Sequence, residues 1–463
     1  MGAATALLIT LFLRKPQSEV GHGRLPATKE DGGHPEVLLP HSIPEDQGHP
    51  QVVLPPSARE DQLPLYDAWG LPMLDHFEER LSPDLKRGKA AIAAAVAEGV
   101  KGFDLSSDDC AAASSIARMI SKDSSDSLIG MTLSLENVTP FHSLEKAGQV
   151  SRVFRIRKLL GESFSASLVE AEDTNTHELF VMRFFRQRAD DGWDAEDPMR
   201  SVARMQEELH LEEMGAENLC GTIPANMVAS KLGVSVPLYT ADIAGVPGGE
   251  RVGDYLVLGR VQLSEMQYGT VLDLLVNRTD VIEQAQEYIA RRLLQIVLKI
   301  QQSGLTHSSI QPGNILLRPD GSIVVADIGS LHPFGSSALE SVWLGPEYQE
   351  PQLSVPADPE AYEGQPAVIQ PTNDIWSLGI NLYEIFVKRR CPFGYYTDDK
   401  DANLQYAQEL VTTTESAQLK EILETKKVPP VWMDLILRLL EPNRERRITA
   451  WGIVEEFPEL VNE

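Results

Sequence analysis

The chain has 463 residues, of which 42% are hydrophobic, so it is long enough for a two-lobed domain with an extension. Its formal net charge is −27, and such an acidic surface repels nucleic-acid phosphates and argues against docking on anionic lipid through a basic helix. Three cysteines without CxxC spacing argue against a zinc site or a disulfide framework.

The chain starts with an apolar run, residues 3–13, followed by Arg14 and Lys15. The run is too short to span a bilayer, and it resembles the core of a secretory signal, although cationic residues follow it rather than precede it. Residues 1–15 are therefore a candidate signal segment. The alternatives are an unstructured apolar start or a wrongly chosen first exon.

A tandem repeat marks the next segment, residues 16–66, with copies that begin at Gly33 and Gly48. Its prolines forbid regular helix, so we expect a disordered arm rich in Pro, Gly and His. Residues 67–150 differ, because residues 74–81, 89–100 and 111–120 have helical composition. They predict a helical extension packed on the main domain.

The main domain begins at about residue 151 with a run of short elements. Residues 153–160, 167–171 and 179–184 predict three strands, and Gly161 and Ser163 lie in the first turn. An acidic amphipathic helix is expected over residues 198–214, followed by a strand over residues 254–261. Further helices are expected over residues 269–275 and 282–302.

A polar loop follows the second of these helices. His307 and Asn314 are seven residues apart, and Asp327 comes thirteen residues after the asparagine. Between Asn314 and Asp327, two apolar runs flank the turn at residues 319–321, which predicts a β-hairpin. The hairpin would bring Asp327 beside Asn314, so that two oxygen ligands could converge on one Mg²⁺.

These residues resemble a eukaryotic protein-kinase domain over about residues 151–460. The resemblance is carried by the positions just named and by Gly329, Tyr348, Pro351 and the run at residues 374–385. It implies an α+β, two-lobed protein-kinase-like fold in residues 151–463, with a β-rich small lobe (151–262), a helical large lobe (267–463) and the helical N-terminal extension.

More narrowly, the chain resembles the rhoptry kinase and pseudokinase family of coccidian (apicomplexan) parasites. The eroded glycine loop that runs into residues 168–171, the stretch at residues 255–275 and the sequence at residues 304–307 carry this resemblance. A folded extension ahead of the kinase domain also fits. In that family a propeptide is often cut at a Ser-apolar-x-Glu site, and residues 42–45 have this form.

The resemblance implies an ATP site between the lobes. Arg183 takes the place of the phosphate-binding lysine, and Glu207 is the candidate for its acidic partner, with Glu208 as the second choice. Arg183 could instead be a strand residue paired with another acid, and Glu207 a solvated residue. The remaining candidate cofactor-binding residues come from three regions. Gly161 and Ser163 belong to the glycine loop, and Asn314 and Asp327 would hold the metal. Val261, Gln262 and Leu263 lie at the start of the segment that meets adenine, residues 262–266.

The catalytic loop departs from the family at one decisive position, because Ser309 stands where the catalytic aspartate belongs. A serine hydroxyl is a poor proton acceptor, and general-base help contributes roughly 10²–10⁴ in rate. Downstream, the resemblance makes Asp374 the anchor of the catalytic-loop backbone. The A-P-E position reads Glu350-Pro351-Gln352, so that Gln352 would offer Arg447 a neutral hydrogen bond; residues 345–347 are a second register.

These departures favour a secreted rhoptry-type pseudokinase, a virulence factor with weak or no ATP and Mg²⁺ binding. It would act as a scaffold or allosteric effector on a host or parasite protein, such as an active kinase or a host GTPase. The alternative is a divergent active Ser/Thr protein kinase. The resemblance implies residence in the rhoptry, a secretory organelle, and release into the host cell or the parasitophorous vacuole; the family's arginine-rich membrane helices are not evident.

Overall fold

The computed structural model describes residues 74–99, 128–142, 150–162, 166–188, 198–246, 248–252, 255–326, 331–335, 348, 350–351, 369–388 and 416–461. The candidate signal segment, the repeat arm and the predicted residues Ser163, Asp327 and Gln352 lie outside this part of the chain. Among the residues described, no helix is both long enough and apolar enough to cross a membrane.

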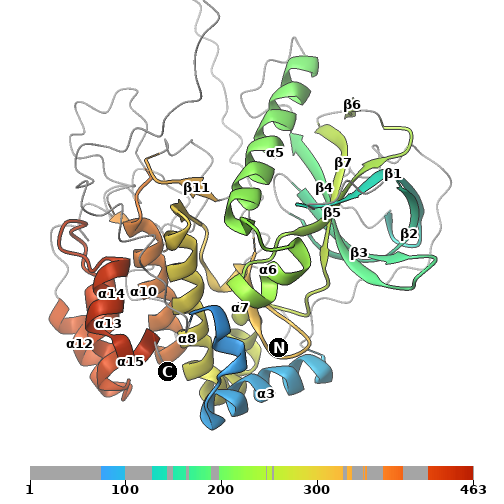
Figure 1. Ribbon diagram of the computed structural model, residues 1–463. Coiled ribbons are helices and arrows are strands. Elements are labelled where there is room, and N and C mark those ends of the chain that lie inside the picture. The colour runs from blue at the N-terminus through green and yellow to red at the C-terminus, as the bar shows by residue number, and fades with distance from the viewer. Residues whose placement is uncertain are drawn as a thin grey trace, which may run out of the picture. The chain divides into compact units, whose positions relative to one another are not determined.

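The small lobe is built on one antiparallel sheet with the strand order β4-β3-β2-β1-β5-β7-β6 (Figure 1). Because β4 also pairs with β7, the first six strands in this order close into a ring, and β6 is added at its edge. Alternate side chains of each strand point into the ring, where Phe154, Phe180 and Phe184 are buried. The strands are β1 (Thr132–Pro140), β2 (Val150–Glu162), β3 (Ala166–Asp173), β4 (Leu179–Arg188), β5 (Pro237–Ile243), β6 (Gly249–Val252) and β7 (Tyr255–Glu265).

Strand β1 corrects one prediction, because residues 67–150 were expected to be helical. β1 lies between β2 and β5 and pairs with both. Leu133 and Leu135 are buried in the ring, whereas Thr132 and Ser134 face outward. This alternation has the period of a strand, and a strand inserted here satisfies backbone groups on both of its edges. The small lobe therefore begins before residue 151.

Helix α5 (Pro198–Cys220) crosses the outside of the ring (Figure 1). Val202, Met205 and Leu209 recur at helical spacing, and they pack with Leu256 and Leu258 of β7. Helix α6 (Ala225–Leu232) follows and leads into β5. The inner face of α5 thus has a fixed position beside β4 and β7.

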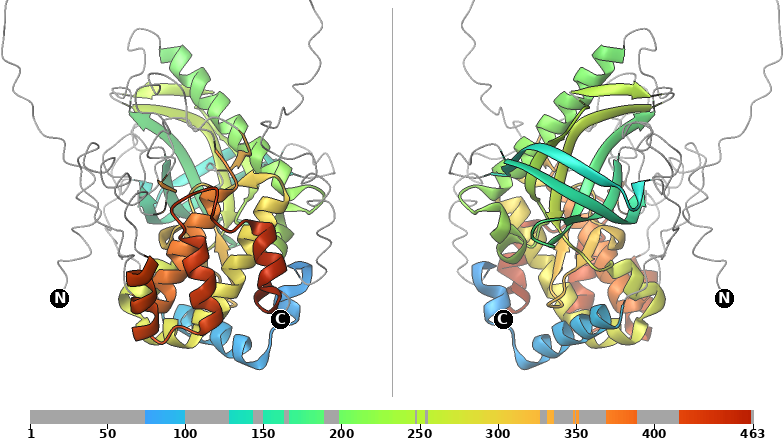
Figure 2. Two further views of the ribbon diagram at one scale, coloured as in Figure 1. Left: turned by 90° about the vertical axis from the view of Figure 1, so that its left-hand side faces the viewer. Right: turned by 90° about the vertical axis from the view of Figure 1, so that its right-hand side faces the viewer.

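The large lobe is helical, and two of its helices are almost entirely buried. These are α8 (Thr279–Gln302) and α10 (Thr372–Val387), which pack against each other at its centre (Figure 2). In the part of the lobe that the structure describes, the other helices are α7 (Val271–Asn277), α12 (Ser416–Thr425), α13 (Pro430–Leu439), α14 (Ala450–Glu456) and α15 (Pro458–Val461). The short elements of the lobe are β8 (Leu305–Thr306), the 3₁₀ turn η5 (Pro312–Asn314), β9 (Ile315–Leu317), β10 (Ile323–Val325) and β11 (His332–Pro333). The predicted two-lobed α+β fold is confirmed.

The extension contributes the 3₁₀ helix η3 (Leu74–Glu79) and helix α3 (Pro83–Glu98). The side chain of Ser82 caps α3 by accepting a hydrogen bond from the backbone N–H of Leu85. Buried residues recur along α3 at spacings of three and four, and this face lies against α8. At Gly88, an added Cβ would lie 3.1 Å from the Cα of Ala285, so the two helices approach closely there. The predicted helical start of the extension is therefore confirmed.

Candidate nucleotide and catalytic site

The catalytic loop is anchored through its backbone. Asp374, at the start of α10, accepts hydrogen bonds from the N–H groups of His307 (2.6 Å) and Ser308 (2.8 Å). Ser308 has φ +57°, a left-handed conformation that a non-glycine residue adopts at a cost of about 1 kcal/mol or more. Burial raises the pKa of Asp374 to about 6, and the two N–H donors oppose that rise. The anchor expected from the sequence is therefore present.

Ser309, the residue predicted at the base position, is held in place by Asn314. The side-chain amide of Asn314 donates to the Ser309 hydroxyl oxygen (2.8 Å) and to the Ser309 carbonyl oxygen (2.9 Å). Ser309 is only 5% exposed. Because the hydroxyl is neutral and already accepts a hydrogen bond, it is poorly suited to take a proton from an incoming alcohol.

The hairpin predicted after Asn314 is present. Strand β9 pairs with β10 through Ile315 and Val325, and the N–H of Ala326 donates to the carbonyl oxygen of Asn314 (2.8 Å). The residue after Ala326, Asp327, lies outside the described residues, so Asn314 is the one predicted metal ligand that the structure places. Because both bonds to Ser309 use the Asn314 nitrogen, its side-chain oxygen remains suited to a Mg²⁺ ion.

Arg183 lies on β4 and forms an ion pair with α5. Its guanidinium donates to Glu212 (3.1 Å) and lies 4.6 Å from the ring centroid of Phe185. The predicted partner, Glu207, is exposed, so this prediction was wrong. The reason is helical phase: Glu212 follows Leu209 by three residues and therefore lies near the packed face, whereas Glu207 lies on the opposite side. This burial periodicity was available in the sequence.

A second glutamate ties α5 to the sheet. Glu213 accepts two hydrogen bonds from Arg260 (3.1 and 3.0 Å) and one from Gln262 (3.3 Å), both on β7. Gln262 was predicted to meet adenine, but it is 2% exposed and its side chain is committed to Glu213. Consecutive glutamates thus bind two neighbouring strands, a contact that the sequence analysis did not anticipate.

The segment expected to meet adenine begins later than predicted. Val261 and Leu263 point into the small-lobe core. Strand β7 continues to Glu265, so the chain leaves the sheet only after that residue. The connection between the lobes is therefore residues 266–269. Tyr268 donates its N–H to the carbonyl oxygen of Leu317 (3.0 Å), and Leu317 donates to that of Gly269 (2.9 Å), which joins this connection to β9.

The glycine loop is only partly described. Gly161 pairs with Leu168 near the end of β2, and no atom lies within 4 Å of the position of an added Cβ. Ser163, the other predicted residue of this loop, lies outside the described residues. On the neighbouring strand β4, Val181 and Arg183 share the face opposite to the core residue Met182. This partly exposed face carries Arg183, the residue that was predicted to bind phosphate.

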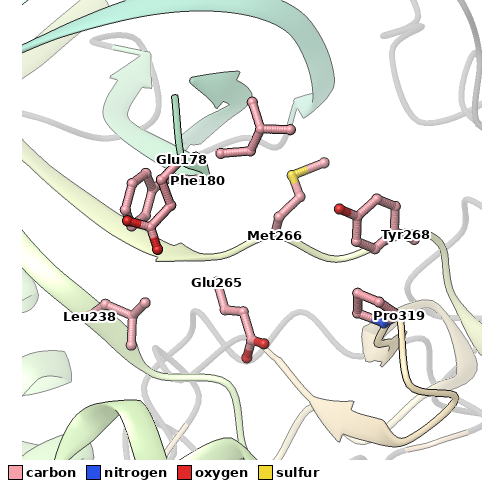
Figure 3. A pocket seen from close by; sticks show the side chains of 8 residues that line it. Glu178, Phe180, Leu238, Glu265, Met266, Tyr268 and Pro319 are labelled. Atoms are coloured by element: carbon pink, nitrogen blue, oxygen red, sulfur yellow. The ribbon is translucent and has the colours of Figure 1, made fainter. Parts of the chain in front are cut away.

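A hollow of about 200 Å³ lies beside the connection between the lobes (Figure 3). Two of the residues that line it, Glu265 and Met266, belong to the segment at residues 262–266 that was predicted to meet adenine. Phe180, which also lines the hollow, belongs to the core face of β4 and thus points away from the face that carries Arg183. The full lining of the hollow is Glu178, Leu179, Phe180, Leu238, Glu265, Met266, Tyr268 and Pro319.

The end of the activation segment contains a buried ion pair. Arg447 donates to Glu350 (2.6 Å), and Arg444 binds the same carboxylate. The side chains of Glu350 and Arg447 are both 0% exposed. We expected Gln352 to be the neutral partner of Arg447. The structure assigns this role instead to Glu350, two residues earlier, because a buried guanidinium needs a carboxylate close by.

Comparisons with known proteins agree with this geometry. Residues 255–457 match the protein kinase domain family. The chain is 27% identical over 192 residues to the serine/threonine-protein kinase cds1 of Schizosaccharomyces pombe, covering 41% of this chain and 39% of the relative. It is 23% identical over 236 residues to the serine/threonine-protein kinase ROP18 of Toxoplasma gondii, covering 50% and 40%. The chain thus matches about two fifths of the length of these relatives.

Solved structures show the same fold. A rhoptry kinase from Toxoplasma gondii superposes with a TM-score of 0.55 at 17% identity, covering 81% of this chain and 93% of that one. ROP2 from the same organism, described as a virulence factor with a protein-kinase fold and no enzymatic activity, gives 0.53 at 17%, covering 81% and 96%. The ROP18 kinase domain, solved with AMP-PNP and sucrose, gives 0.53 at 18%, covering 82% and 95%.

The fold is that of a protein kinase, with the small lobe, catalytic loop and central helix in their expected order. The chain therefore shares the protein-kinase fold of the rhoptry kinases, as the predicted resemblance implies, and residues 255–457 match the protein kinase domain family.

Proposed function

We propose that this protein is a rhoptry-type pseudokinase that binds nucleotide weakly and acts on another protein as a scaffold or allosteric effector. One observation carries the proposal: a buried serine, Ser309, stands at the base position with its hydroxyl held by Asn314. A kinase that must deprotonate an alcohol needs a carboxylate there. The fold relative ROP2 is itself described as lacking enzymatic activity.

Two features support a nucleotide ligand. Arg183 remains charged on the cleft face of β4, and its pairing with Glu212 restricts the guanidinium to one region. Asn314 has an amide oxygen available for Mg²⁺, which would bridge and neutralise phosphate oxygens. Arginine is longer and more forked than the usual lysine, so the phosphate geometry must differ and affinity should be low.

The test uses the full chain, with ATP in the presence and absence of Mg²⁺. We expect a metal-dependent rise in Tm that Arg183→Met abolishes and that Arg157→Met, on exposed strand surface, leaves intact. Transfer of radiolabelled phosphate to a generic substrate should be undetectable in the wild type. Ser309→Asp should raise it, since a positioned base contributes about 10²–10⁴ in rate. No rise in Tm at millimolar ATP would contradict the nucleotide site.

The second candidate is a divergent active kinase, favoured by the intact Arg183–Glu212 pair and by Asn314. Phosphoryl transfer depends mainly on positioning and charge stabilisation, which these residues could still provide. Robust transfer by the wild type that Ser309→Ala leaves unchanged would establish this alternative and overturn the pseudokinase. In either case we propose origin in the rhoptry and secretion, with a host or parasite protein as the partner, such as an active kinase or a GTPase.

A further inference from the structure

Helix α3 of the extension contacts the tip of the hairpin that follows the catalytic loop. Lys89 on α3 places its ammonium group 3.0 Å from the carboxylate of Asp320, in the turn between β9 and β10. The same ammonium group donates to Glu78 of η3 at 2.8 Å. One cation of the extension is therefore shared between an acid of its own segment and an acid of the hairpin.

The backbones meet at the same place. Gly321 has φ +80°, and a Cβ added there would lie 2.0 Å from the carbonyl oxygen of Lys89 and 2.9 Å from the backbone nitrogen of Ala93. A side chain at position 321 is thus excluded both by the backbone conformation and by α3 itself. The turn at Gly321 and helix α3 are therefore in direct backbone contact, with no space for a side chain between them.

The extension is also fixed to the large lobe beneath this contact. Glu78 accepts a hydrogen bond from the hydroxyl of Tyr288 (2.8 Å) and lies 3.4 Å from the guanidinium of Arg292. Both partners are on α8, and the side chain of Arg292 is 1% exposed. Burial alone would lower the pKa of Lys89, but Glu78 and Asp320 outweigh it and raise that pKa above its ordinary value. Lys89 is therefore a permanent cation with a fixed support.

From the tip, contacts continue to both parts of the nucleotide site. Asp320 accepts hydrogen bonds from the N–H and the hydroxyl of Ser322 (3.0 and 2.6 Å), which shapes the turn. Arg318 closes the turn from the other side and donates to Glu265 at the end of β7 (2.8 Å). The hairpin has only three residue pairs, so its tip lies about 10 Å from the base that carries Asn314.

We propose that the extension is a positioning element of the nucleotide site, with Lys89 as the residue through which it holds the Asn314 hairpin and the connection between the lobes. Lys89 does not touch the site; it acts through Asp320 and the short, stiff hairpin. The claim about the hairpin stands on these contacts alone. The claim about nucleotide rests in addition on the function proposed above.

The first test is hydrogen exchange on the full chain. In Lys89→Met, amides of residues 315–326 and 266–270 should exchange about tenfold faster, while those of β2 and β3 keep their protection. The matched control is Arg87→Met on the same helix, whose pair with Asp84 is exposed on both sides, and it should change neither region. Lys89→Arg, which keeps the charge, should restore most of the protection.

The second test separates docking from glycine conformation. Gly321→Ala should accelerate exchange in the same two regions, because it pushes the turn off α3. Gly245→Ala has a similar φ of +85° but no atom within 4 Å of the added Cβ, so it should not. Unchanged exchange of the hairpin in both Lys89→Met and Gly321→Ala would overturn the proposal, and so would equal acceleration throughout the small lobe.

The third readout is affinity for Mg²⁺–ATP, which should fall about threefold or more in Lys89→Met and stay unchanged in Arg87→Met. If the wild type binds no nucleotide, the proposed function fails, while the exchange result still decides whether the extension positions the hairpin. If nucleotide binds and Lys89→Met exchanges faster without loss of affinity, the positioning role for the site is refuted.

Discussion

The large lobe and the small lobe use ion pairs in different ways. In the large lobe, Glu350 and Arg447 are fully buried, and Asp374 receives two backbone N–H donors without any exposure. In the small lobe, Arg183 and Glu212 are 18% and 23% exposed. The buried set fixes the framework around the catalytic loop, whereas the partly exposed pair includes Arg183, the residue predicted to bind phosphate.

The difference explains which departures from a working kinase the fold accommodates. A buried arginine cannot lose its partner without leaving an uncompensated charge, and in this chain Glu350 supplies the carboxylate that pairs with Arg447. A substitution at a position that takes part in phosphoryl transfer changes the stability of the fold little, but it lowers the reaction rate strongly. Ser309 and Arg183 therefore differ from the kinase pattern while the surrounding anchors persist.

The largest expected effect is at the buried pair. Arg447→Met should lower the free energy of unfolding by about 3–5 kcal/mol, because Glu350 would keep only Arg444 as its ionic partner in a desolvated site. The control is Arg438→Met, whose pair with Glu456 is largely exposed and should contribute about 0–1 kcal/mol. Urea unfolding measures both, and equal losses would contradict the comparison between buried and exposed pairs.

The next effect is a pH dependence at Asp374. Its pKa is about 6 in the folded protein against 3.8 for the free group, so the folded state binds more protons. The contribution is fully present below pH 3.8 and is lost as the pH rises through 6, by about 3 kcal/mol in total.

Asp374→Asn removes this titration. The variant loses an acceptor for one backbone N–H, at a cost of about 1–3 kcal/mol, so it is less stable than the wild type at low pH. Unfolding in urea from pH 4 to pH 7 should show the gap between the two proteins narrowing as the pH rises. A constant gap would show that Asp374 keeps its ordinary pKa in the folded state.

The smallest effect concerns α5. Glu212→Gln should cost about 0.5–1 kcal/mol in the free energy of unfolding, since its pair with Arg183 is partly exposed. Glu207→Gln on the exposed side of the same helix should cost almost nothing. Both can be measured by thermal unfolding, with ATP binding as a second readout that only Glu212→Gln should weaken. A larger loss at Glu207 would restore the pairing expected from the sequence.

The sequence was a good guide wherever a local pattern had one interpretation. The resemblance carried by the run at residues 374–385 predicted the catalytic-loop anchor, and the two apolar runs around residues 319–321 predicted the hairpin. The sequence did not show which of several glutamates on one helix forms the ion pair with a given arginine. Glu207, Glu208, Glu212 and Glu213 share one helix, and the choice among them depends on how that helix rolls against β4 and β7.

By itself the sequence determined that this chain has a kinase framework, because residue order and spacing carry that information directly, and it predicted serine at the base position and arginine at the phosphate position. Only the tertiary structure decided that β1 closes the small-lobe sheet, that Glu350 meets Arg447, and that Lys89 reaches Asp320. These contacts join residues far apart along the chain. Burial and the close packing of backbones select such partners, and neither is written in any one segment.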